Sequence, residues 1–196
     1  MKLIAEFGAL LVVATQSLTA YGAGAHVHGS ATLQVAVDGN RVNLDFSSPL
    51  ENLVGFEHAP RNDKQKAAVR RMAERLHKAG TLFVPTPEAR CAAGAVNLQS
   101  QVLDRSLLAA AGAANEASPS PSGRGPQKRS GAADKEEHAE LSAEFALQCE
   151  RPERLAGLEV KLFDVFPGVK RIDVQVAGGK KQASARLTSR NRRVAL

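Results

Sequence analysis

Two neighbouring stretches near the start of the chain alternate apolar and polar residues, and this pattern restricts the fold more than any other. The stretches are "ATLQVAVD" at 31–38 and "RVNLDF" at 41–46, and an Asp-Gly-Asn turn sequence lies at their junction. Successive side chains of a strand point to opposite faces, so the alternation predicts two strands that each bury one face. The turn sequence predicts that they form a β-hairpin.

A single helix is predicted over about 63–79. Asn62 or Asp63 can cap its start, and Gly80 is expected to end it. Its apolar residues recur at helical spacing, and the opposite face is rich in Lys and Arg, which indicates a solvated surface. The apolar residues are Val69, Met72, Ala73, Leu76 and Ala79.

Six further stretches have the composition of strands. They are residues 81–84, 95–103, 138–149, 158–166, 170–177 and 181–188. Many strands around one clear helix predict an α+β fold, a single domain dominated by antiparallel β-sheet. The chain is long enough for one such domain to bury a substantial core.

A change of composition divides this domain. Residues 104–137 are rich in Ala, Ser, Gly, Pro and charged residues. Such a segment has too little apolar surface to offset the entropy of ordering, so we expect a disordered or loosely packed low-complexity insert. It separates a first half of the domain, 26–103, from a second half, 138–196.

The first 25 residues have the layout of a secretory signal peptide. Lys2 precedes an apolar run, and the small residues Ala23 and Ala25 frame a cleavage site. The mature chain then begins at His26; a cut after Ala20 is the alternative. The apolar run is too short to span a membrane, and no later stretch is apolar enough, so we expect an exported, periplasmic protein without a membrane span.

The chain has two cysteines, Cys91 and Cys149. An even number in an exported protein predicts one disulfide, which would join the two halves across the insert. The alternative is a pair of free buried thiols.

Histidines are the residues most suggestive of chemistry. His26 and His28 share one face if the chain is extended there, because side chains alternate with period two. Two imidazoles so placed can converge on one metal ion, and His58 and His138 could complete a tetrahedral zinc site. The alternative is a solvated histidine pair, and His77 on the helix flank is interpreted as structural or solvated.

The cleavage site allows a second metal chemistry. A mature chain that starts His-Val-His offers a free amine, two backbone amides and the imidazole of His28. This square-planar nitrogen set suits Cu2+ or Ni2+ rather than Zn2+.

Enzyme signatures are missing from the sequence. It contains no Gly-x-Ser-x-Gly, His-Glu-x-x-His, P-loop or Cys-x-x-Cys-His motif, so no catalytic activity is predicted. Glu57 adjoins His58, but nothing supplies a nucleophile, and a turn or metal-ligand role is favoured for it.

Positive charge is concentrated near the C-terminus. Residues 170–193 contain eight basic residues against Asp173 alone, a net charge of +7, whereas the whole chain carries +6. The segment is interpreted as the solvated face of a terminal hairpin, with contact to anionic envelope surfaces as the alternative function. A nucleic-acid partner is not expected because the protein is exported and the segment lacks interleaved aromatic residues.

Several of these blocks together resemble one family. They are "HVHGSATLQVAVDGNRVNLDFSSPLENLVGFEHAP", "LFVPTPEAR" before Cys91, "HAELSAEFALQC" and "KLFDVFPGVKRIDVQV". The chain is similar in them to the ZrgA family of zinc-regulated periplasmic zinc-uptake proteins. The likeness covers nearly the whole mature chain except the insert.

The resemblance implies a periplasmic zinc-binding protein that delivers or stores zinc for import and is not an enzyme. A component of a zinc ABC transporter is the partner it would imply. The residues that match the family blocks are His26 and His28 at the opening, Glu57 and His58 in "GFEH", His138, and the cysteine pair Cys91 and Cys149. One departure is that no histidine lies between His77 and His138, so the insert is not a histidine-rich zinc reservoir.

Overall fold

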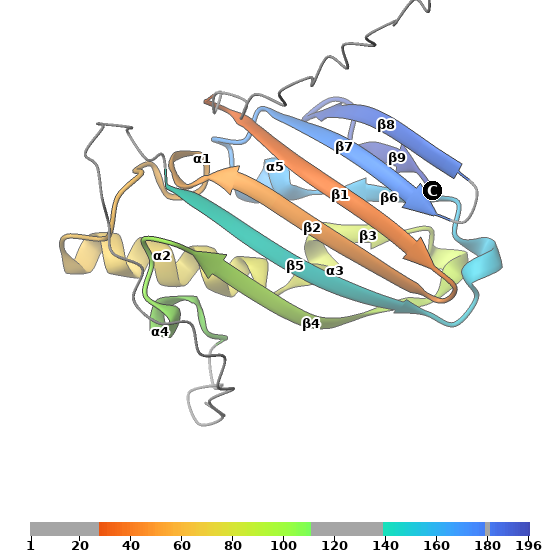
Figure 1. The fold of residues 1–196 in the computed structure, drawn as a ribbon, viewed down its shortest axis with the longest axis horizontal. Helices are drawn as coiled ribbons and strands as arrows, with labels where there is room; N and C mark the ends of the chain where they lie inside the picture. The colour runs from red at the N-terminus through yellow and green to blue at the C-terminus, as the bar shows by residue number, and fades with distance from the viewer. Residues whose placement is uncertain (1–27, 111–138, 179–180) are drawn as a thin grey trace, which may run out of the picture.

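The protein folds around a six-stranded sheet (Figure 1). The structure, a computed structural model, describes residues 28–110, 139–178 and 181–196. The strands lie in the order β4-β5-β2-β1-β7-β8, and every neighbouring pair is antiparallel except β1 and β7, which are parallel. They are β1 (Ser30–Asp38), β2 (Arg41–Pro49), β4 (Cys91–Ser100), β5 (Glu140–Cys149), β7 (Arg171–Gly178) and β8 (Lys181–Thr188). The predicted hairpin is confirmed as β1 and β2.

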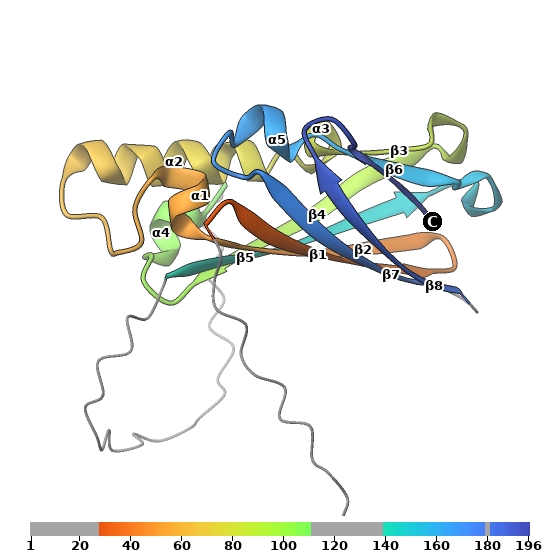
Figure 2. The ribbon, with the colours of Figure 1, turned by 90° about the horizontal axis from the view of Figure 1, so that it is seen from above.

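One face of this sheet is covered, and the other is open. Figure 2 shows three helices and a second, smaller sheet together on one side of the large sheet. The helices are α2 (Asp63–Leu76), α3 (Ala79–Leu82) and α5 (Leu162–Val165). Side chains on the covered face, such as Leu33 and Leu44, are fully buried, whereas their neighbours Gln34 and Asn43 are exposed. The sheet-dominated α+β fold is therefore confirmed.

The covering layer is built from short elements. The smaller sheet has the order β3-β6-β9 and consists of β3 (Phe83–Pro85), β6 (Gly157–Val160) and β9 (Arg193–Ala195). Phe83 of this layer packs against Phe145 of the large sheet, with ring centroids 4.8 Å apart. The core is thus made mainly of Phe, Leu, Val and Ala, in a chain that has no tryptophan.

The one long helix, α2 (Asp63–Leu76), begins where the sequence predicts. The side chain of Asn62 accepts a hydrogen bond from the backbone N–H of Gln65, and the Gln65 side chain accepts one from the N–H of Arg61. Together these two bonds satisfy backbone donors at the helix start. The helix ends three residues before the predicted end, because His77 caps it and α3 (Ala79–Leu82) starts separately.

Three other short helices were not predicted from the sequence. The loop after β2 contains α1 (Leu50–Val54), and the predicted strand 158–166 divides into β6 and α5 (Leu162–Val165). The start of the predicted insert folds as α4 (Arg105–Leu108), because its two leucines bury against the core. The hydrogen bonds from Ser106 to the Asp104 carboxylate cap this helix and lower the pKa of Asp104. The predicted insert from residue 111 and the predicted signal peptide lie outside the described residues.

The predicted disulfide between Cys91 and Cys149 is confirmed. The two cysteines lie directly opposite each other where β4 starts and β5 ends. Each half of the domain supplies one of them, so the bond fastens the second half to the edge strand of the sheet.

Candidate metal centre

The structure describes three of the five predicted metal ligands. His28, Glu57 and His58 are described, whereas His26 and His138 lie outside the described residues. His28 lies two residues before the start of β1, and the other two follow α1.

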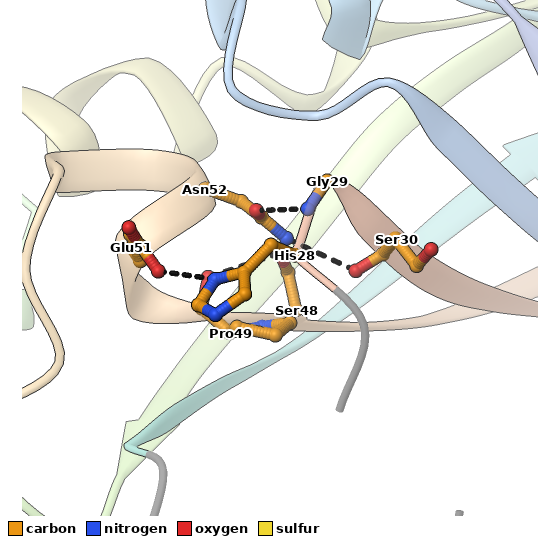
Figure 3. A network of polar contacts seen from close by, with 7 residues as sticks. All are labelled: His28, Gly29, Ser30, Ser48, Pro49, Glu51 and Asn52. Atoms are coloured by element: carbon orange, nitrogen blue, oxygen red, sulfur yellow. Dashed lines mark hydrogen bonds and ion pairs between the residues drawn. The ribbon is translucent and has the colours of Figure 1, made fainter. Parts of the chain in front are cut away.

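His28 and Glu57 come together with a third residue, Glu51. One ligand atom from each of the three side chains lies within 4.8 Å of the others, and this is the one such group of metal-binding side chains in the described part of the chain. The Nδ1 atom of His28 directly contacts the carboxylate of Glu51 (Figure 3). The cluster therefore joins residues that are far apart in sequence.

Short local structure places both carboxylates. Glu51 lies in the first turn of α1, and the helix ends at Gly55, which has the left-handed backbone angle φ of 84°. Glycine adopts this conformation without the steric cost that a side chain imposes. The chain turns back there, so Glu57 returns to the side of the helix that carries Glu51.

A buried asparagine holds the two parts of the site together. Asn52 is only 6% exposed and bonds to the start of β1: its Oδ1 accepts from the N–H of Gly29 at 2.7 Å, and its Nδ2 donates to the carbonyl of Ser30 at 3.0 Å. The same Nδ2 also donates to the hydroxyl of Ser48 at 3.2 Å (Figure 3). Asn52 thus ties the backbone beside His28 to the helix that presents Glu51.

A glycine packs against the other side of this asparagine. A Cβ atom added to Gly168 would lie 2.3 Å from the backbone oxygen of Asn52, closer than real Cβ contacts. The backbone N–H groups of Lys170 and Arg171, just after this glycine, both donate to the carbonyl of Gly29. The segment before β7 therefore supports the same corner of the molecule.

His58 lies near the cluster in sequence but is not one of its three members. Its Nδ1 lies 2.8 Å from the carbonyl of Ala59, and its ring stacks on Phe56 with a centroid separation of 5.1 Å. Glu51 was not among the ligands predicted from the sequence. The helical register of α1 that directs Glu51 toward His28 is not visible in so short a segment.

The donor set fits a zinc ion. Zinc is bound in proteins by imidazole nitrogen and carboxylate oxygen, and three protein ligands leave a fourth position for water or another ligand. The site is also accessible, since the side chains of His28 and Glu51 are 69% and 45% exposed. An open, exposed site suits reversible binding and exchange of an ion better than permanent enclosure.

The basic C-terminal segment is partly paired within the protein. Arg171 and Arg186 both contact Asp173, at 3.1 and 2.9 Å. In the same segment Arg192 pairs with Asp164 at 2.5 Å and Arg193 with Glu159 at 3.4 Å. Half of the eight basic residues of this segment are therefore matched by carboxylates.

We expect Asp173 to titrate at unusually low pH. The hydrogen bond from Arg186 and the nearby charge of Arg171 lower the pKa of its carboxyl. A carboxyl group whose pKa is lower in the folded than in the unfolded protein stabilises the fold at pH values above its unfolded pKa, which is about 3.9. This stabilisation is lost as the pH falls through the folded-state pKa. Since Asp173 is 41% exposed, the contribution should stay below about 1 kcal/mol.

The measurement is a carboxyl NMR titration of the protein and of an Arg186→Gln variant. The substitution should raise the pKa of Asp173 toward the ordinary value. Identical Asp173 titration curves in the two proteins would contradict the assignment of Arg186 as the main cause.

The comparisons with known proteins agree with this donor set. The family model described as ZrgA family zinc uptake protein matches residues 25–196. No curated protein is similar enough to the chain to count as a match. None of the helices within the described residues has the length and apolar character needed to cross a membrane.

Proposed function

Because the chain belongs to the ZrgA family of zinc uptake proteins, we propose that it is a periplasmic zinc-binding accessory that captures zinc ions and holds or delivers them for import. The observation that supports this role most directly is the convergence of His28, Glu51 and Glu57 on one accessible point. Export to the periplasm is proposed from the signal-like first 25 residues.

In this proposal zinc is cargo, and the three side chains are its ligands. The neutral imidazole of His28 supplies nitrogen, and Glu51 and Glu57 supply oxygen and offset the charge of the ion. All three ligands must be deprotonated to bind, so protons compete with zinc and acidification releases it. No step requires catalysis, and we propose that the protein is not an enzyme.

Two further histidines are proposed to strengthen the site. His26 lies two residues before His28 in the sequence. His138 directly precedes Ala139, and the carbonyl of Ala139 accepts a hydrogen bond from the N–H of Leu50. Leu50 is the residue before Glu51. Either imidazole, or that of His58, would serve as the fourth ligand. The expected recipient of the ion is a component of a zinc ABC transporter.

The test is a calorimetric zinc titration of the chain from His26 onward at neutral pH. The double substitution Glu51→Gln, Glu57→Gln should weaken zinc binding by at least about 100-fold, since loss of a supporting outer partner alone costs about 10–100-fold. Glutamine keeps the size of the side chain and removes the anionic ligand.

The matched control is Glu88→Gln, Glu153→Gln, which changes the net charge equally at two exposed positions outside the cluster. Its zinc affinity should equal that of the unmodified protein. Equal zinc affinity in both double variants would exclude the cluster as the binding site.

Single substitutions His26→Ala, His58→Ala and His138→Ala then identify the fourth ligand. A parallel Cu2+ titration with one residue added before His26 tests the alternative N-terminal copper site.

A further inference from the structure

A row of basic residues runs along the outward side of α2. Lys64, Arg71 and Arg75 recur at intervals of seven and four residues, and Lys78 follows just after the helix. All four are exposed. We call these four residues the basic stripe; with 3.6 residues per turn, they lie on one side of the helix.

The stripe is not balanced by acidic neighbours on the helix. Residues 61–78 contain seven basic residues and two acidic ones, Asp63 and Glu74, a net charge of +5. Asp63 pairs with Lys66, which is outside the stripe. Arg71 and Arg75 are four residues apart, and like charges at this spacing destabilise a helix. An anionic partner would relieve this repulsion.

A cavity lies at the C-terminal end of the stripe. It has a volume of about 340 Å³ and is lined by Arg75, Lys78, Thr81, Leu82, Asp164 and Val165. Arg75 is held there by a hydrogen bond of 3.2 Å from its Nη1 to the carbonyl of Val165. The one carboxylate in the lining, Asp164, is already paired with Arg192. The cavity therefore offers two cationic side chains beside an apolar wall formed by Leu82 and Val165.

We propose that the basic stripe and this cavity form a docking surface for an extended acidic segment of a partner protein. From Lys64 to Lys78 the stripe spans about 21 Å at 1.5 Å per helical residue, the length of about six residues of extended chain. One Asp or Glu side chain of that segment enters the cavity, with its methylene groups against Leu82 and Val165 and its carboxylate facing Arg75 and Lys78. The remaining acidic side chains pair with the rest of the stripe.

The arrangement favours a protein segment over a lipid surface. Helices that lie in a membrane interface insert apolar side chains between the lipids. The apolar side chains of α2, among them Val69, Met72 and Leu76, are instead buried in the core of the protein. This leaves the exposed side of α2 with charge for contact and a cavity for a single side chain. The surface is separate from the metal cluster, so the inference goes beyond zinc binding.

The experiment measures binding of a fluorescently labelled oligoglutamate peptide of about six residues to the full protein by fluorescence anisotropy. The triple substitution Arg71→Gln, Arg75→Gln, Lys78→Gln should weaken binding roughly tenfold or more. The control triple Arg41→Gln, Arg151→Gln, Arg154→Gln removes the same charge from exposed positions away from α2 and should leave binding nearly unchanged. Binding should also weaken as salt rises from about 50 to 150 mM.

Two additional measurements separate the outcomes. Zinc affinity and the thermal unfolding midpoint should be the same in both triple variants, which distinguishes failure at this surface from failure of the zinc site or of folding. Equal loss of peptide binding in both triples would reduce the effect to net charge and overturn the proposal. The proposal would also be overturned if the unmodified protein did not bind the peptide. The same conclusion would follow if the basic stripe bound phosphatidylglycerol vesicles but not the peptide.

Discussion

Reducing the Cys91–Cys149 disulfide is expected to lower the free energy of unfolding by about 4 kcal/mol, because the bond closes a loop with a sequence separation of 58 residues. The open loop of the reduced, unfolded chain has more conformations than the cross-linked one. A loss of this size is a large part of the 5–15 kcal/mol that typically stabilises a domain. It should lower the thermal midpoint by roughly 10 °C.

The measurement is denaturant unfolding of the oxidised protein, the reduced protein and a Cys91→Ala, Cys149→Ala variant. Reduction keeps both sulfur atoms and isolates the cross-link, whereas the variant also loses the packing of Cys149, which is 2% exposed. The variant should therefore be slightly less stable than the reduced protein. A reduced protein within about 1 kcal/mol of the oxidised one would show that the cross-link contributes little.

The substitution Asn52→Leu should damage stability and zinc binding together. Leucine has a similar size but cannot bond to the N–H of Gly29, the carbonyl of Ser30 or the hydroxyl of Ser48. Each buried polar group left without a partner costs about 1–3 kcal/mol, so we expect a loss of roughly 3 kcal/mol in unfolding free energy after some relaxation. Zinc affinity should fall about 10–100-fold, as for other residues that orient a metal ligand.

The appropriate control is Asn97→Leu. Asn97 is exposed on β4 and has a single side-chain bond, to Glu144 at 3.1 Å. Its replacement should change stability by less than about 0.5 kcal/mol and leave zinc affinity unaltered. If Asn52→Leu kept full zinc affinity while losing stability, Asn52 would support the fold without orienting the site.

Sequence reasoning succeeded where a pattern extends over many residues. The alternation of β1 and β2 and the apolar stripe of α2 each repeat several times, so the buried face can be identified from the sequence. The start of α2 was also predictable, because Asn62 provides a local capping signal. The family resemblance added the choice of metal, which the spacing of His26 and His28 leaves open.

Prediction from the sequence failed where contacts between distant segments determine the local structure. The short helix α1 has only five residues, too few for a periodic pattern, and it is fixed by bonds from Asn52 to β1 and by its contact with Gly168. Glu51 therefore could not be recognised as a partner of His28. Similarly, "LFDV" in α5 has the composition of a strand but forms a helix turn between β6 and β7.

The parallel pairing of β1 and β7 has a consequence for how the chain can fold. Ser30 pairs with Arg171, so β1 can pair with β7 only after most of the chain is available. Contacts between such distant residues slow folding, because the entropy of closing the loop is lost before the contact is gained. That entropy grows only logarithmically with loop length, and doubling a flexible loop costs about 0.6 kcal/mol. We expect the β1–β2 and β7–β8 hairpins, whose strands are close in sequence, to form before β1 pairs with β7.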